Sequence, residues 1–162
     1  MKKIQSLLHS SSIFLLCMSI QAQNLDWAFN LGGGEDDGAR SIVLDQDGNI
    51  YMTGSFQETV DFDTGSGTAN LHSKGLTDVY IAKYDSKGNY LWAKNMGGLY
   101  WDFGHSITLD SAGNILLTGI YRNTSDFDPG PGVENLSSNG WYNLFVAKYD
   151  NDGNYIWAHV RW

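Results

Sequence analysis

Short segments rich in β-branched and aromatic residues alternate with turns of glycine and asparagine along most of the chain. Apolar side chains occupy both sides of these segments, because Ile50 and Met52 alternate with Tyr51 rather than with a polar residue. A sheet with one side in water instead alternates apolar with polar residues. The pattern therefore predicts small sheets that are covered on both sides, with strands over 41–45, 50–56, 79–85 and 90–95 and over the segments 65 residues later.

One unit occurs twice. Residues 27–91 and 92–156 align without a gap and are identical at 32 of 65 positions, and a third copy begins at Trp157 before it departs from the pattern. Four-stranded sheets that repeat in tandem and cover one another are typical of a β-propeller. We therefore predict an all-β fold of two four-stranded antiparallel β-propeller blades, with spare outer strands near Trp27 and Trp157.

The repeat also predicts how the chain is divided. We expect a first blade over 41–97, preceded by an outer strand and entry loop over 23–40, and a second blade with the start of a third repeat over 98–162. Propellers contain about four to eight blades, and bare apolar sheet faces cost several kcal/mol at roughly 25 cal/mol per Å2. We expect a fragment of a larger propeller, with further blades in the full-length chain, or a small homo-oligomer that completes the ring.

The first 22 residues resemble a secretory signal peptide rather than an N-terminal core helix. Lys2 and Lys3 precede a short apolar run over 13–20, and Ala22 is a small residue suited to cleavage. The run is too short for a permanent membrane span, and no transmembrane segment is expected in the mature chain. Cleavage would also remove Cys17, the single cysteine. We expect a secreted or cell-surface protein without disulfides.

The charge balance excludes one class of partner. The chain has 10 Lys and Arg residues against 18 Asp and Glu residues, a net charge of −8. Binding to nucleic acid requires a basic surface, so no nucleic-acid partner is expected.

A short motif, Asp-x-x-Gly-Asn, stands between predicted strands at 45–49, 85–89, 110–114 and 150–154. Its glycine is fourth and no glutamate follows at the twelfth position, unlike an EF-hand loop. Asp accepts backbone N–H groups and Gly adopts the left-handed conformation in tight turns. The motif therefore predicts hairpin turns.

Several motifs together resemble the bacterial SBBP-type β-propeller repeat family: Trp-Ala-x-x-x-Gly-Gly, Asp-x-x-Gly-Asn-Ile-x-x-Thr-Gly, Asp-Phe-Asp-Pro-Gly-Pro-Gly and Phe-Val-Ala-Lys-Tyr-Asp. The resemblance covers residues 27–158. It implies one blade per repeat and an exported protein of Bacteroidetes-like bacteria. It implies no reaction, because the family has no catalytic motif.

Differences between the two copies gather in the longer loops. Successive strands run in opposite directions, so successive connections lie at opposite ends of a sheet. Both short turns of a unit therefore lie at one end, and the long loops, 57–77 and 122–142, lie at the other. Binding residues most often lie in such long loops. There the second copy has gained aromatic residues, which suit stacking on sugar rings or an apolar partner. The candidate ligand-binding residues are Tyr100, Trp101, Trp141 and Tyr142. Packing between blades is the alternative role for these side chains.

The repeated Asp-Phe-Asp element offers a second candidate site. Paired carboxylates that project the same way would suit Ca2+, the one cofactor considered. The residues are Asp61, Asp63, Asp126 and Asp128. The alternative is that these carboxylates accept backbone N–H groups within a glycine-rich loop.

Taken together, the sequence predicts a non-catalytic binding or interaction module, with a polysaccharide or a surface protein as its partner. One alternative is part of a secreted propeller lyase or hydrolase whose catalytic residues lie in missing blades. The other alternative is a structural spacer.

Overall fold

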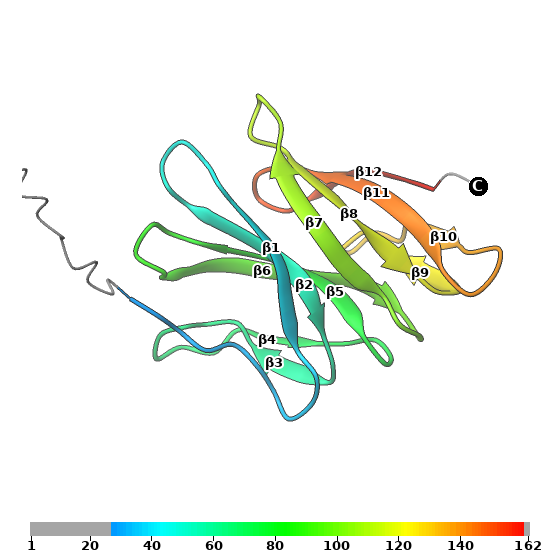
Figure 1. Cartoon of the computed structure of the whole chain (residues 1–162), viewed down its shortest axis with the longest axis horizontal. Coiled ribbons are helices and arrows are strands. Elements are labelled where there is room, and N and C mark those ends of the chain that lie inside the picture. Colours follow the sequence, from blue (N-terminus) through cyan, green and yellow to red (C-terminus); the bar gives the residue numbers. More distant parts are fainter. Residues whose placement is uncertain (1–26, 161–162) are drawn as a thin grey trace, which may run out of the picture.

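The structure, a computed structural model, describes residues 27–160; the expected signal peptide lies outside this range. The described residues form strands and no helix, and so contain no helix long and apolar enough to cross a membrane. Two four-stranded antiparallel sheets lie against each other (Figure 1). In spatial order, the four long strands of the first are β1 (Gly38–Leu44), β2 (Ile50–Phe56), β5 (Asp78–Tyr84) and β6 (Tyr90–Gly98), and two short strands, β9 (Thr124–Asp126) and β10 (Asn135–Ser137), continue this sheet beyond β6. The second contains β7 (Phe103–Leu109), β8 (Ile115–Tyr121), β11 (Asn143–Tyr149) and β12 (Tyr155–Val160). The predicted all-β fold of β-propeller blades is confirmed.

Each long loop contains a short hairpin that the sequence pattern did not predict. These hairpins are β3 (Thr59–Asp61) with β4 (Asn70–His72), and β9 (Thr124–Asp126) with β10 (Asn135–Ser137). Strand β9 also pairs with the end of β6, where Gly97 lies opposite Asp126 and Gly98 lies opposite Ser125. The hairpin that follows β8 is therefore hydrogen-bonded to the last strand of the first sheet.

The spare outer strands expected near Trp27 and Trp157 are not observed as such. No strand is present between Trp27 and Asp37, and residues 23–26 lie outside the described range. This segment instead packs across the first sheet, with Phe29 beside Tyr84 at 5.0 Å between ring centroids. Trp157 belongs to β12, the fourth strand of the second sheet, rather than to a spare strand.

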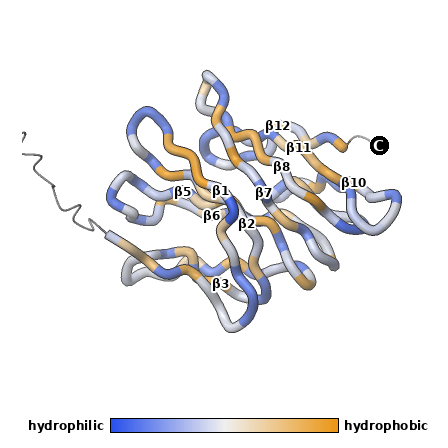
Figure 2. Tube along the Cα trace, viewed as in Figure 1, coloured by the Kyte–Doolittle hydropathy of each residue, from blue (hydrophilic) through white to orange (hydrophobic). Residues whose placement is uncertain are grey.

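The main core lies between the two sheets. It joins Val79, Ile81 and Met96 of the first sheet to Phe145 and Tyr149 of the second, all at most 1% exposed. A second apolar cluster lies on the opposite side of the first sheet, under the β3–β4 hairpin. Hydrophobic residues follow the strands, and hydrophilic residues gather in the connecting loops (Figure 2). Both sides of the first sheet are thus apolar, as the strand pattern predicted.

The four Asp-x-x-Gly-Asn motifs form hairpin turns, as predicted. In the turn after β7, Asp110 Oδ1 accepts the N–H of Ala112 and of Asn114, each at 2.9 Å, and the Asn114 amide donates back to the same carboxylate. Gly113 takes φ +81° there, and the corresponding glycines of the other three turns have φ between +75° and +82°. The Asp carboxylate oxygens therefore accept hydrogen bonds from the backbone of the turn.

Candidate functional site

The connections of the two sheets separate into two ends. The Asp-x-x-Gly-Asn turns of both sheets share one end, where those at 45–49 and 110–114 line the same hollow. The long loops with their hairpins and the 99–102 connection lie at the other end, since strands alternate in direction. This loop end brings together three of the four candidate aromatic residues.

Three aromatic rings surround the guanidinium of Arg122. Its central carbon lies 4.4 Å from the ring centroid of Trp141, 4.9 Å from that of Trp101 and 5.3 Å from that of Tyr100. A guanidinium is attracted to the negative face of an aromatic ring within about 6 Å. We call Arg122, Tyr100, Trp101 and Trp141 the arginine–aromatic cluster. Trp141 is 74% exposed, so much of its surface remains open to a ligand.

Backbone contacts with the first sheet fix the loop that carries Tyr100 and Trp101. The N–H of Thr77 donates to the carbonyl of Tyr100 at 3.1 Å, and the N–H of Asp102 donates to the carbonyl of Thr77 at 2.9 Å. Trp101 is thereby held as a one-residue parallel bridge beside Thr77. The cluster thus stands at the junction of the two sheets.

Asp102 holds the base of the cluster. Its carboxylate accepts the N–H of Gly98 at 2.7 Å and the N–H of Arg122 at 3.0 Å, and the Ser125 hydroxyl lies 2.9 Å from both oxygens. The side chain is only 1% exposed. Burial raises the pKa of Asp102 to about 6, with a smaller contribution from the negative charge of Asp78, and the hydrogen bonds partly oppose this shift. One carboxylate therefore fixes the backbone of Arg122 and the backbone at the start of the 99–102 loop.

A cleft of about 530 Å³ opens beside Trp101, between the starts of β1 and β7. Charged and polar groups line it, among them Asp36, Arg40 and Gln57. Thr77 also lines the cleft, and its buried Oγ1 has no hydrogen-bond partner among the described residues. Trp101 thus borders both the cleft and Arg122, so one ligand could contact the two together.

Tyr142 lies apart from Arg122. Its ring is tilted against that of Phe103, with 6.5 Å between the centroids, and 42% of the residue is exposed. Arg122 itself was missed by the sequence interpretation. A comparison of the copies contained the necessary signal, since Gln57 occupies the matching position of the first unit. The cluster is therefore specific to the second unit.

The paired aspartates face their own loops. Asp61 Oδ1 accepts the N–H groups of Asp63 and Ala69, at 3.0 and 2.8 Å, and Asp63 Oδ1 accepts that of Gly65 at 2.7 Å. Asp126 and Asp128 repeat this arrangement. Asp126 also pairs with Lys74 of the first unit at 3.0 Å. Within residues 27–160 no group of three or more His, Cys, Asp or Glu side chains is arranged to hold a metal ion, and a calcium site here remains a prediction.

Comparisons with known proteins agree with the fold. No family model matches the chain. Over 130 residues, 73% of this chain, it is 33% identical to an uncharacterized WD repeat-containing protein of Acanthamoeba polyphaga mimivirus, of which the match covers 9%. Over 133 residues, 82% of this chain, it is 26% identical to the regulatory protein FlaEY of Caulobacter vibrioides, of which the match covers 13%. The chain thus spans about a tenth of the length of the curated relatives it matches. Neither relative bears on the narrower SBBP-type resemblance; together with the structure, the similarity to a WD repeat-containing protein indicates a repeat protein of β-propeller type.

Proposed function

We propose that this chain is a non-catalytic binding module of an exported protein, and that its arginine–aromatic cluster binds a polysaccharide at or outside the cell surface. Support for export comes from the N-terminal sequence pattern alone. Support for a binding role comes from the similarity to a WD repeat-containing protein and from the position of the cluster at the loop end of a rigid β scaffold.

The observation that carries the proposal is the enclosure of Arg122 by three aromatic rings. Neither of the two ion pairs among the described residues involves Arg122, although the chain as a whole is acidic. A guanidinium stacked on aromatic faces keeps its in-plane N–H groups free, and these suit a carboxylate in a bidentate arrangement. The cluster therefore favours a sugar that carries a carboxylate, such as a uronic acid.

The surroundings of the cluster favour a glycan over a folded protein. Beside Tyr100 is an open hollow lined by Leu99, Asn123, Thr124 and Ser138, which supply an apolar side chain, one amide and two hydroxyl groups. Sugars present alternating apolar ring faces and hydroxyls, so flat aromatic rings next to amides and hydroxyls match their chemistry.

The test is isothermal titration calorimetry of the purified chain with uronate oligosaccharides and with neutral glucan oligosaccharides. Trp101→Ala and Trp141→Ala should each weaken binding to uronate oligosaccharides by about tenfold, since each removes one stacking surface. Arg122→Gln, which introduces the residue found at the same position of the first unit, should weaken binding to uronate and leave binding to neutral sugar unchanged.

Trp27→Ala is the matched control, because Trp27 is an exposed tryptophan that stacks on Phe29 away from the cluster. It should leave all affinities unchanged. Absence of measurable binding to either class of sugar would reject the glycan proposal. Equal loss in the control would place the binding site elsewhere.

A further inference from the structure

The loop between β10 and β11 contains the single Asn-Gly step of the chain, Asn139-Gly140. An asparagine followed by glycine loses its side-chain amide readily, because glycine has no side chain to hinder the approach of its own backbone nitrogen to the asparagine side chain. The matching step of the first unit is Lys74-Gly75, which cannot react in this way. The susceptible step therefore occurs only in the second unit.

The structure leaves this step open to reaction. Asn139 and Gly140 are both exposed, and a Cβ atom on Gly140 would meet nothing within 4 Å. Among residues 27–160, the N–H of Gly140 donates no hydrogen bond. By contrast, Gly48 and Gly153, which each follow an aspartate, donate their N–H groups to a carbonyl of their own turn at 3.2 and 3.0 Å. The backbone nitrogen is therefore free at Asn139-Gly140 and engaged in those turns.

The same loop contacts the arginine–aromatic cluster on both sides of Asn139. The N–H of Ser138 donates to the carbonyl of Asn123 at 2.7 Å, and Ser138 Oγ accepts the N–H of Asn123 at 2.8 Å. On the other side, the ring of Trp141 lies 4.4 Å from the guanidinium carbon of Arg122. Asn139 thus lies between two residues that contact the Arg122–Asn123 segment.

We propose that Asn139 is a site of spontaneous deamidation, and that the carboxylate formed there pairs with Arg122. The backbone nitrogen of Gly140 loses its proton to hydroxide and bonds to Cγ of Asn139, while the bond from Cγ to the side-chain amide nitrogen breaks and ammonia leaves. Water then opens the succinimide ring at either carbonyl and gives aspartate or isoaspartate. In sum, one water is consumed and one ammonia is released, with no change of oxidation state.

Arg122 is suited to pair with the new charge. It takes part in neither of the two ion pairs among the described residues, and the N–H groups in the plane of a guanidinium match a carboxylate. Isoaspartate also adds one methylene group to the main chain between Ser138 and Trp141, which displaces the tryptophan. Deamidation should therefore close the cluster to an anionic ligand as the protein ages, a consequence that rests on the proposed function.

Peptide mapping by mass spectrometry tests the reaction without any ligand. The folded chain is incubated at 37 °C at pH 7 and at pH 9. The peptide containing Asn139 should gain the mass difference between an amide and a carboxyl group, faster at pH 9, and isoaspartyl methyltransferase should label it. Asn139→Gln should prevent the change, because glutamine must close a larger ring. A synthetic peptide of residues 135–145 gives the rate in an unfolded chain. An unchanged Asn139 in the folded chain, while this peptide reacts, would overturn the proposal.

The ion pair is tested by NMR titration of the Asn139→Asp variant. The pKa of the carboxyl group at position 139 should lie well below the usual value of about 3.9, because a nearby positive charge favours the ionised form. Adding Arg122→Gln should return this pKa to the usual value. The same pKa in the single and the double variant would overturn the pairing.

Calorimetry with uronate oligosaccharides then tests the consequence for binding. Asn139→Asp should weaken binding by about three- to fivefold, as expected for one exposed ion pair that competes with the ligand. Asn151→Asp is the matched control, because it adds the same charge at an exposed position in a turn at the opposite end of the sheet, and it should bind as the wild type does. Full affinity in Asn139→Asp, with affinity lost in Arg122→Gln, would overturn the pairing. Absence of uronate binding by the wild type would reject the proposed function alone, since the mass and the titration decide this inference without a sugar.

Discussion

Asp102 shows how a single buried side chain positions the candidate site. It accepts hydrogen bonds from the backbone of Gly98 and Arg122, and so joins the end of β6 to the end of β8. The cost of its burial appears as a pKa raised to about 6, compared with 3.8 in an exposed carboxyl. The folded state therefore holds this proton more tightly than the unfolded state does.

This difference in pKa predicts a pH dependence of stability. Below about pH 4 both states are protonated, and the full contribution to stability is present. Between about pH 4 and 6 the unfolded chain loses the proton readily and the folded chain does not, so the free energy of unfolding should fall by about 3 kcal/mol as the pH rises. Burial also raises the pKa of Asp78, which acts in the same direction. Urea unfolding between pH 4 and 7.5 measures the slope.

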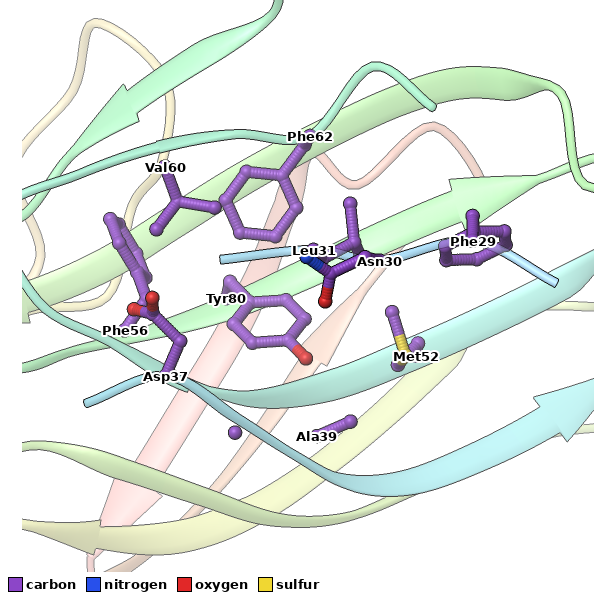
Figure 3. A pocket seen from close by; sticks show the side chains of 11 residues that line it. Phe29, Asn30, Leu31, Asp37, Ala39, Met52, Phe56, Val60, Phe62 and Tyr80 are labelled. Atoms are coloured by element: carbon purple, nitrogen blue, oxygen red, sulfur yellow. The ribbon is translucent and has the colours of Figure 1, made fainter. Parts of the chain in front are cut away.

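Two variants distinguish the contribution of Asp102 to this pH dependence from that of the other carboxyl groups. Asp102→Asn should flatten the slope between pH 4 and 6. Asp37→Asn changes the matching, only partly buried position of the first unit, where the side chain lines a pocket (Figure 3), and serves as the control. A slope that is equal in the wild type and in Asp102→Asn would contradict the assignment.

Sequence reasoning identified Trp101 and Trp141 but could not predict what they enclose. The two residues differ from their counterparts in the first unit, and this difference pointed to the right loops. The ring-to-guanidinium distances depend on how Asp102 and Thr77 fix the backbone of those loops. Such contacts join residues that are distant in sequence, so no local pattern reveals them.

At the scale of single elements, the hairpin turns allow a substitution whose effect comes from backbone conformation alone and not from a steric contact. Gly113 has φ +81°, and a Cβ atom there would meet nothing within 4 Å. Gly113→Ala should therefore cost only the strain of a left-handed L-residue, about 1–2 kcal/mol. The measurement is the free energy of unfolding. Gly34→Ala is the control, because Gly34 also has open space around it but no positive φ, and its effect should be within about 0.5 kcal/mol.

The long strands could be predicted and the short hairpins could not. Alternation and β-branched residues marked β2 and β8, each seven residues long. Strands β3 and β9 have only three residues, and their sequences, Thr-Val-Asp and Thr-Ser-Asp, carry little apolar signal. Their pairing depends on loop aspartates and on the neighbouring sheet. A strand of three residues is too short to show an alternation of apolar and polar residues.

At the scale of the whole molecule, stability depends on the contact between the sheets. Phe145 is fully buried in this contact, and its neighbour Leu144 points the other way and is 55% exposed. Phe145→Ala should cost about 3–5 kcal/mol, and Leu144→Ala less than about 1 kcal/mol in dilute solution. Urea unfolding followed by tryptophan fluorescence measures both. Equal effects of the two substitutions would contradict the packing between the sheets.

The pairing of β9 with Gly97 and Gly98 has a consequence for how such chains lengthen. The same two glycines occur as Gly32 and Gly33 at the start of the first unit, and Gly33 already lies beside the Thr59 carbonyl of the first hairpin. In each unit, therefore, the glycine pair near the start contacts the short hairpin of the same unit, and in the second unit this contact joins the last strand of the first sheet to the hairpin that follows β8. Gene duplication in steps of one whole unit can therefore lengthen the array while the same hairpin-to-glycine contact is repeated at every junction.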